Sequence, residues 1–314
     1  IDPLQLDDVS ALRAFLTDPS QTKLIHSASE DLEVFSYWLG VLPAPLFDTQ
    51  RAAALLGLGA GQSYRALVAH FFDIELPKDE TQSDWLQRPL SNAQAQYAAQ
   101  DVSYLHPMGV QLQNRATELN RLDWILEEGA RLRPGGKPPI AKFKTAYRLP
   151  PEQQRVLAEV VEWREGEARH RDRPRSWILN DKIVMGVARS VPRSVRALAA
   201  VEDMPQGLVR RAGDELVARI VGAADADTDQ PPALILKPLA SEQRGLVSML
   251  SECLKQIAES MDVPAEVLMP KADLEHLIRE QMNPSLAAPD NWSGWRAETV
   301  VTPLRERLKE RAAS

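Results

Sequence analysis

Several features are scarce in this 314-residue chain, and each scarcity excludes a class of protein. Cys253 is the only cysteine, so an intrachain disulfide and a cysteine-based zinc site are both excluded. No apolar run approaches the ~20 residues that a membrane-spanning helix needs, and no signal peptide opens the sequence. We therefore predict a cytoplasmic protein that does not enter a membrane. No obligate protein partner is inferred.

The remaining composition is typical of a globular protein. Hydrophobic residues make up 44% of the chain and charged residues 26%, which excludes wholesale disorder. A chain of this length is expected to form two or three domains. Because the first residue is Ile1 and not Met, we expect the sequence to be a processed or truncated product.

Charge is distributed unevenly along the chain. Residues 1–130 contain 8 Lys and Arg against 18 Asp and Glu, whereas residues 131–224 contain 19 against 11. Residues 225–314 are acidic again, with 10 against 15. The basic region is where we expect a polyanion to bind; the alternative is ordinary variation in surface charge between domains.

Two stretches of unusual composition divide the chain. Residues 131–148 combine Pro and Gly with six basic side chains, and residues 222–232 are small and acidic and end in a Pro pair. Neither stretch can bury much apolar surface, so both are predicted to be exposed connectors. The predicted division is a first domain at 1–130, a basic linker at 131–148, a helical domain at 149–222, an acidic linker at 223–238 and a last domain at 239–314.

The first region mixes strand and helix patterns. Short extended segments are predicted at 23–26 and 43–48, and helices at about 27–39, 49–56, 63–71 and 91–117. Ser27 and Glu30 have the spacing of a capping box, Ser91 is a predicted N-cap, and Pro107 is expected to kink the long helix. Since strands are few, we expect an α/β fold that lacks its opening strands.

Beyond residue 149 the patterns are helical throughout. Helices are predicted at 152–167, 177–190, 195–201 and 205–221, separated by turn signals. The Glu152–Arg155 segment is echoed by Glu242–Arg244, and Pro174 is echoed by Pro264. This rhythm predicts a diverged tandem pair of small helical domains with a period of about 90 residues.

Carboxylates are the candidate catalytic groups of the first region. Asp31 lies one turn inside a predicted helix, and Tyr97 and Asp101 are spaced i, i+4 so that they project from one helix face. Carboxylate oxygens suit Mg²⁺ or Mn²⁺. On spacing alone, however, the Tyr97–Asp101 pair is more typical of a surface contact.

Four segments, in order, resemble bacterial ribonuclease D, a family in the DEDD superfamily of 3′→5′ exonucleases. They are His26–Val34, Phe47–Gln50, a stretch with Lys78, Ser83–Trp85 and Arg88–Leu90, and Tyr97–Leu105. The Tyr-x-x-x-Asp form of the last segment is that of the tyrosine subclass. The resemblance implies an RNase H-like exonuclease core that is incomplete at its N-terminus.

The same resemblance implies roles for single residues. Asp31 and Asp101 match metal ligands, and Tyr97 matches the residue that orients the attacking water in two-metal phosphodiester hydrolysis. Five further positions recur in the family without being metal ligands, and they are expected to support the fold or contact substrate: His26, Asp48, Lys78, Asp84 and Trp85. Of these, Asp48 and Asp84 are interpreted as caps or fold braces.

The first family motif, an Asp-x-Glu on an opening strand, does not occur upstream of Asp31. With two of four carboxylates, we expect this 314-residue stretch to bind catalytic metal weakly and to have little nuclease activity.

The basic region contains a second resemblance. Pro174–Asp181, with Pro192, is similar to the HRDC domain, a small helical nucleic-acid-binding module. Arg169, Arg171, Arg173 and Arg175 are the predicted RNA-binding residues, and Trp177 is expected to lie in the core. Residues 239–314 resemble a second, degenerate copy, whose acidic balance predicts packing or substrate enclosure.

The resemblance implies a metal-dependent 3′→5′ exoribonuclease that uses two Mg²⁺ or Mn²⁺ ions. Its expected partner is RNA with a free 3′ end, such as tRNA precursors. The alternative is a non-catalytic RNA-binding protein or an inactive exonuclease fragment, in which the helical domains carry the function.

Overall fold

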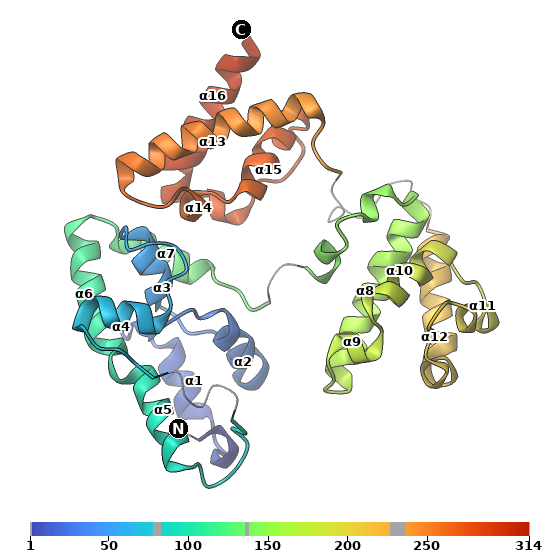
Figure 1. Cartoon of the computed structure of the whole chain (residues 1–314), viewed down its shortest axis with the longest axis horizontal. Helices are drawn as coiled ribbons and strands as arrows, with labels where there is room; N and C mark the ends of the chain where they lie inside the picture. The colour runs from blue at the N-terminus through green and yellow to red at the C-terminus, as the bar shows by residue number, and fades with distance from the viewer. Residues whose placement is uncertain (1, 78–82, 136–137, 227–236, 314) are drawn as a thin grey trace. The chain divides into compact units, whose positions relative to one another are not determined.

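The chain folds into two compact units (Figure 1). Its structure, a computed structural model, describes residues 2–77, 83–135, 138–226 and 237–313. The first unit combines residues 1–135 with residues 239–314, so it contains both ends of the sequence. The second unit comprises residues 136–238.

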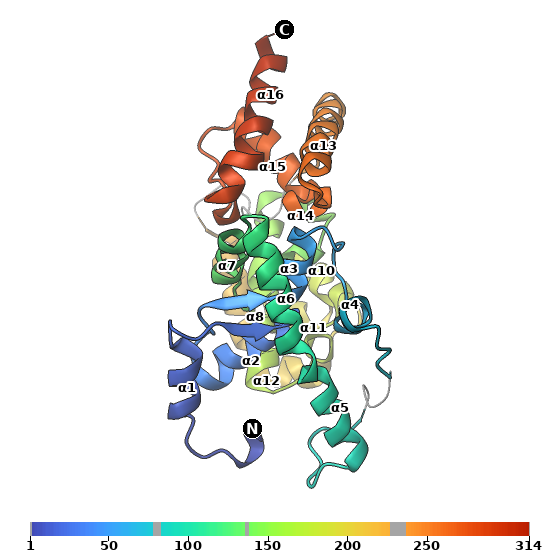
Figure 2. The ribbon, with the colours of Figure 1, turned by 90° about the vertical axis from the view of Figure 1, so that its left-hand side faces the viewer.

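A short parallel sheet lies within the first unit. Strands β1 (Lys23–Ile25) and β2 (Leu46–Asp48) pair in parallel with Lys23 opposite Leu46, and Figure 2 shows them side by side. Both strands fall on the predicted extended segments. The surrounding elements are η1 (Pro3–Gln5), α1 (Ser10–Thr17), α2 (Ser29–Leu39), α3 (Thr49–Leu55), α4 (Tyr64–Phe72), α5 (Asn92–Ser103), α6 (Leu105–Glu118) and α7 (Leu122–Arg131).

Glycines allow two helices to approach the strands closely. A Cβ on Gly109 of α6 would lie 2.6 Å from a methyl carbon of Leu24 in β1. A Cβ on Gly129 of α7 would lie 1.9 Å from the carbonyl oxygen of Leu46 in β2. Real Cβ atoms are never that close to a carbonyl oxygen, so α7 can lie directly against β2 only because residue 129 has no side chain.

The start of α2 differs from the prediction. The capping box at Ser27 and Glu30 is wrong, because Ser27 has a left-handed backbone with φ 59° and α2 begins at Ser29. The carboxylate of Asp48 instead accepts the N–H groups of Ser27 (3.2 Å) and Ala28 (2.9 Å). A buried acceptor from the neighbouring strand therefore replaces the local cap.

The long helix predicted over 91–117 is divided into α5 and α6. The break lies at Tyr104, whose N–H donates to the Tyr64 hydroxyl (3.0 Å), so the predicted kink at Pro107 is misplaced. Pro107 lies in the first turn of α6, where a missing N–H costs little. The predicted N-cap at Ser91 is correct, and it forms a capping box with Gln94.

The C-terminal helices of the first unit share its hydrophobic core. These elements are α13 (Ser241–Met261), α14 (Ala265–Leu268), α15 (Lys271–Met282), η4 (Asp290–Trp292), η5 (Ala297–Val301) and α16 (Thr302–Ala313). One cluster of buried side chains joins Met108 and Ile125 to Leu250 and Leu304. The rings of Trp124 and Trp295 stack with their centroids 4.7 Å apart. The predicted last domain is therefore packed into the first unit.

The second unit is a helical domain with its own core. Its helices are α8 (Pro151–His170), α9 (Arg175–Ile178), α10 (Asp181–Ser190), α11 (Val195–Ala199) and α12 (Gln206–Ala224), preceded by η2 (Pro139–Lys142) and η3 (Ala146–Arg148). Ile140, Phe143 and Ala146 are buried in that core. The prediction that 131–148 is an exposed connector is therefore wrong for its second half, because the short η2 and η3 turns bring these apolar side chains onto the helices.

Three helices recur at an interval of 90 residues. α8, α9 and α10 begin at Pro151, Arg175 and Asp181, and α13, α14 and α15 begin at Ser241, Ala265 and Lys271. The loop before the short second helix contains a left-handed residue at the equivalent position in both, Asp172 with a φ of 50° and Asp262 with a φ of 52°. In the part of the chain that the structure describes, no helix is long and apolar enough to span a membrane.

Candidate functional site

Asp31 lies in the first turn of α2, which follows β1 after a connection of three residues. Its side chain reaches the surface. Desolvation by the surrounding protein raises the pKa of Asp31; a backbone hydrogen bond opposes this, and the charges of Glu30 and Asp48 add to it. A carboxylate with a raised pKa is one that a bound cation would stabilise.

Asp48 fixes the position of that turn. It is the last residue of β2 and its side chain is buried, with 3% of the residue exposed. Besides Ser27 and Ala28, its carboxylate accepts the N–H groups of Gln50 (2.9 Å) and Arg51 (3.2 Å) at the start of α3. One carboxylate thus caps two chain segments, at the beginning of α2 and of α3.

Tyr97 and Asp101 line one cavity. The cavity has a volume of 170 Å³, and its walls also include Tyr64, Arg65 and Gln100. Desolvation raises the pKa of Asp101, although the side chain is accessible. The i, i+4 spacing on α5 therefore brings the phenol and the carboxylate to a shared concave surface.

His26 and Tyr64 connect the end of β1 to this cavity. The His26 ring contacts the Tyr64 ring edge-on, with centroids 5.8 Å apart, and its Nδ1 is 3.0 Å from the Thr49 hydroxyl. Burial lowers the pKa of His26, against the opposing charge of Asp48. Tyr64 was not predicted as a site residue, because no motif marks it in the sequence.

The remaining predicted positions support this region locally. The Trp85 ring lies 5.9 Å from the Tyr97 ring. Asp84 is exposed and accepts the N–H of Leu86 (3.0 Å), and its carbonyl oxygen accepts a hydrogen bond from Gln94 (2.9 Å). Lys78 lies outside the described residues.

Asp31 and Asp101 are each of the residue type that a divalent cation prefers. No cationic side chain of the described residues lowers the pKa of Asp31 or Asp101, and desolvation raises both. Accessible carboxylates with this property suit a hard cation. Asp31 is not among the residues that line the Tyr97–Asp101 cavity, and the described ranges contain no group of three or more metal-binding side chains.

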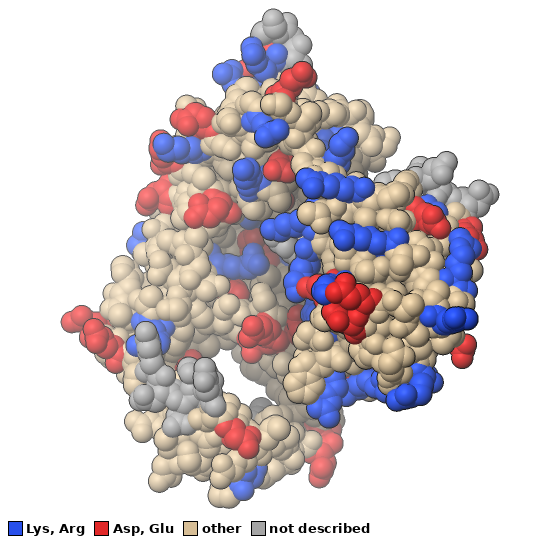
Figure 3. Space-filling view, turned by 45° about the vertical axis from the view of Figure 1, so that its right-hand side comes forward, with Lys and Arg blue, Asp and Glu red and all other residues tan. Residues whose placement is uncertain are grey.

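A basic edge lies on the second unit, at the end of α8 and the start of α9. Arg169 and Arg173 are exposed, Arg171 pairs with Glu167, and Arg175 lies 3.3 Å from Glu165. Figure 3 shows blue Lys and Arg side chains scattered over the visible face of the second unit. We call residues 169–177 the arginine edge.

Trp177 is part of the arginine edge and not of the core. Its exposed fraction is 71%, so the prediction that it lies in the core is wrong. The next two residues, Ile178 and Leu179, are buried instead. The Arg173 guanidinium lies 5.7 Å from the Trp177 ring centroid, so a cation and a stacking surface stand together at the surface.

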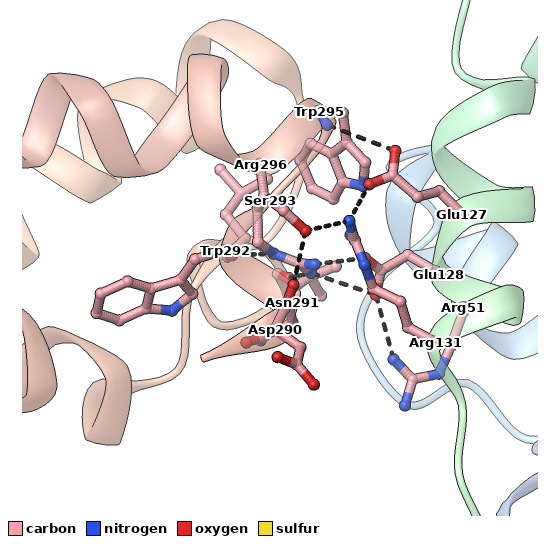
Figure 4. Close-up of polar contacts among 12 residues, drawn as sticks. Arg51, Glu127, Glu128, Arg131, Asp290, Asn291, Trp292, Ser293, Trp295 and Arg296 are labelled. Carbon is pink, nitrogen blue, oxygen red and sulfur yellow. Dashed lines mark hydrogen bonds and ion pairs between the residues drawn. The ribbon is translucent and has the colours of Figure 1, made fainter. Parts of the chain in front are cut away.

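A larger cavity lies in the first unit, between the strand ends and the C-terminal helices. Its volume is 440 Å³, and Ser27, Asp48, Arg51, Glu128 and Arg296 are among its lining residues. The buried Arg296 pairs with the buried Glu128, as Figure 4 shows. Sequence reasoning missed this cluster because 168 positions separate Glu128 from Arg296.

Comparison with known proteins agrees with this architecture. A family model described as "3'-5' exonuclease" matches residues 1–116, and one described as "HRDC domain" matches residues 153–220. The crystal structure of Escherichia coli RNase D, described as an exoribonuclease involved in structured RNA processing, superposes with a TM-score of 0.85 at 31% identity. That match covers 99% of this chain and 85% of the other.

Curated relatives lead to the same family. Ribonuclease D of Pseudomonas paraeruginosa is 39% identical over 98% of this chain and 84% of its own length. Ribonuclease D of Xanthomonas oryzae is 37% identical over 98% of this chain and 85% of its own length. The predicted exonuclease fold followed by helical HRDC structure is confirmed. The chain therefore belongs to the ribonuclease D family of 3′→5′ exoribonucleases.

Proposed function

We propose that this exoribonuclease removes nucleotides from the free 3′ ends of RNA, tRNA precursors among them, with Asp31 and Asp101 as ligands of Mg²⁺ or Mn²⁺. The observation that carries the metal assignment is that the match to the family model described as "3'-5' exonuclease" spans both accessible carboxylates, Asp31 and Asp101. A 3′→5′ exonuclease fold implies dependence on a divalent metal.

The two carboxylates have a simple chemical task. When a divalent ion is bound, it lowers the pKa of a coordinated water and stabilises the charge on the leaving 3′ oxygen. Asp31 and Asp101 supply hard, negatively charged oxygens for such an ion. Asp48 keeps the turn that carries Asp31 in place, since its buried carboxylate accepts the Ser27 and Ala28 N–H groups.

Tyr97 is assigned to water positioning. Its hydroxyl both donates and accepts hydrogen bonds, and it lines the same cavity as Asp101. The Trp85 ring, 5.9 Å away, restricts the orientation of the phenol. A fixed phenol can therefore hold a water next to the scissile phosphate without accepting its proton.

The arginine edge is assigned to RNA binding. Exposed arginines supply phosphate contacts, and an exposed tryptophan supplies a face on which a base can stack. Residues 149–222 then form an HRDC domain that holds RNA, and residues 239–314 a second, degenerate one with a packing role. We further assign the protein to the cytoplasm, without an obligate protein partner.

A non-catalytic RNA-binding protein is the competing function. It would also need the arginine edge, but it would have no use for the accessible carboxylates of Asp31 and Asp101. The two functions therefore differ in what Asp101→Asn does to the full-length protein.

The deciding experiment compares Asp101→Asn with wild type in 3′ trimming and in RNA binding. We expect turnover to fall at least about 100-fold, more than for residues behind a metal ligand, while RNA affinity persists. Tyr97→Phe should slow cleavage without weakening metal binding. Asp73→Asn is the matched control, because Asp73 ends α4 with a left-handed backbone that Asn also adopts. Unchanged turnover in Asp101→Asn would overturn the metal assignment.

A further inference from the structure

A buried ion pair joins the C-terminal helices to the nuclease part of the first unit. Arg296 and Glu128 are 6% exposed each, and the Arg296 guanidinium bonds both oxygens of the Glu128 carboxylate. Arg296 also donates to the carbonyl oxygens of Leu268 (2.7 Å) and Val267 (3.0 Å) at the end of α14. The fork of one side chain thus holds α14 and α7 in a single geometry (Figure 4).

Glu128 also contacts α3. Its carboxylate lies 3.4 Å from the guanidinium of Arg51, near the start of α3. The backbone N–H of Arg51 in turn donates to Asp48. Three successive contacts, through Glu128 and Arg51, therefore join Arg296 to Asp48, and both residues line the same 440 Å³ cavity.

A second path runs through the backbone. Glu128 is followed by Gly129, where α7 lies directly against the Leu46 carbonyl group of β2. β2 ends at Asp48, which holds the N–H groups of Ser27 and Ala28. Any shift of α7 therefore moves the carboxylate that sets the first turn of α2, where Asp31 lies.

We infer that the Arg296–Glu128 pair positions Asp31, so that the C-terminal helices are a working part of the nuclease site. The inference rests on the proposed role of Asp31 as a metal ligand. Arg296 and Glu128 touch neither metal nor substrate; they are positioning residues that act through Arg51, β2 and Asp48.

Holding the C-terminal helices on the nuclease part does not by itself explain the Arg296–Glu128 pair. A large apolar core already joins the two parts, and Trp295 stacks on Trp124 within it. Burying two charges in such a core adds little stability compared with apolar residues of the same size. The pair instead fixes how α14 lies on α7. The hydrogen bonds from the Arg296 guanidinium to the Glu128 carboxylate and to two carbonyl oxygens are directional, so they are compatible with one register of the two helices.

The test uses the full-length protein with Arg296→Met and Glu128→Gln. We expect amide hydrogen exchange at Ala28 and Leu32 to become about tenfold faster. The dissociation constant for Mg²⁺, measured by calorimetry without RNA, should rise about tenfold, as it does when residues behind a metal ligand are lost. The kcat should fall while the KM for RNA stays the same. The double variant should be no worse than the single ones, because both residues act in one path.

Arg305→Met is the matched control. Arg305 also pairs with a glutamate, Glu280 (2.6 Å), and lies against a tryptophan, Trp292 (5.6 Å), but its partners are all in the C-terminal helices. It should change neither the exchange in α2 nor the Mg²⁺ affinity. Arg296→Lys, which keeps the charge and loses the fork, gives a folded second variant with a smaller effect of the same sign.

The outcomes separate this inference from the proposed function. If Arg296→Met and Arg296→Lys leave α2 exchange and Mg²⁺ affinity at wild-type values, or if Arg305→Met changes them equally, the positioning role is overturned. Asp31→Asn tests the metal assignment by itself. Should it leave Mg²⁺ affinity unchanged, the proposed ligand is wrong, whatever the exchange of α2 shows.

Discussion

The two helical repeats present the same edge to different surroundings. Residues 169–177 of the second unit correspond, 90 positions later, to residues 259–267 of the first. The arginine edge carries Arg169, Arg171, Arg173, Arg175 and Trp177, all accessible or partly accessible. The equivalent positions are Glu259, Met261, Val263, Ala265 and Val267.

Residues 259–267, the equivalent of the arginine edge, pack against the nuclease part of the first unit. Val263 is 4% exposed and belongs to the shared core, and the Met261 carbonyl oxygen accepts a hydrogen bond from Arg121 (2.5 Å). The equivalent loop is therefore exposed to solvent in one repeat and packed against protein in the other. Which of these occurs is decided by whether its side chains are arginines or aliphatic residues.

Buried arginines distinguish the repeats in the same way. In the second unit, Arg164 of α8 donates to the Leu179 carbonyl oxygen (3.1 Å) and to Asp181 (2.8 Å). The carbonyl oxygen at the end of the short helix α9 is therefore hydrogen-bonded by a residue of the same repeat. The equivalent of Arg164 is Leu254, and the end of α14 is held by Arg296 instead. Arg296 reaches on to Glu128, which ties the repeat to the nuclease.

The largest effect on stability is expected from placing an arginine of the arginine edge at the equivalent, packed position in residues 259–267. Val263→Arg places an unpaired charge in the shared core, and we expect the first unit to lose about 3–5 kcal/mol of stability. Urea unfolding followed by tryptophan fluorescence measures the loss. The reverse change, Arg173→Val, should leave the stability of the second unit nearly unchanged, because Arg173 is exposed. A loss below about 1 kcal/mol in Val263→Arg would contradict the packed edge.

The next largest effect is expected from removing arginines from the arginine edge, which should weaken RNA binding. For Arg171, Arg173 and Arg175 replaced by Ala, we expect weaker binding to unrelated sequences and a salt dependence flatter by up to about two units. Thermal stability should change little, since exposed ion pairs contribute little. Arg210, Arg211 and Arg219 on α12, also exposed, form the control set. Wild-type affinity and salt slope in the first variant would place the RNA elsewhere.

Trp177 provides a smaller and more specific test. Trp177→Ala should weaken binding of single-stranded RNA by about 1–3 kcal/mol without changing the salt slope, because stacking involves no charge. Trp177→Phe should retain most of the affinity. Filter binding or fluorescence anisotropy at several salt concentrations separates the two contributions. If Trp177→Ala instead unfolds the second unit and spares affinity, the tryptophan has a core role after all.

The smallest effect concerns the pH dependence of stability. Because the pKa of Asp31 is raised on folding, the native protein holds this proton to higher pH than the unfolded chain does. The contribution of Asp31 to the free energy of unfolding therefore falls as the pH rises through the pKa of the folded state. Asp31→Asn should melt of the order of 1 °C higher at neutral pH without metal, and the difference should vanish below the ordinary Asp pKa. A lower melting temperature at neutral pH would contradict the raised pKa.

Local patterns in the sequence determined much of the first unit and its candidate site. The strands at 23–25 and 46–48, the cap at Ser91 and the shared face of Tyr97 and Asp101 follow from residues a few positions apart. Period and capping are properties of one segment, so they can be read before the chain folds. The family motifs likewise depend on order and spacing along the chain.

Only the tertiary structure decided which of several equally good partners each residue meets. Asp48, and not Ser27, sets the start of α2, because a strand 20 positions away brings a carboxylate to it. Trp177 is exposed because the adjacent Ile178 and Leu179 fill the core. Arg296 meets Glu128 because two helices that are distant in sequence bury one apolar core. Burial and ion pairing depend on contacts between distant segments, and no local pattern encodes them.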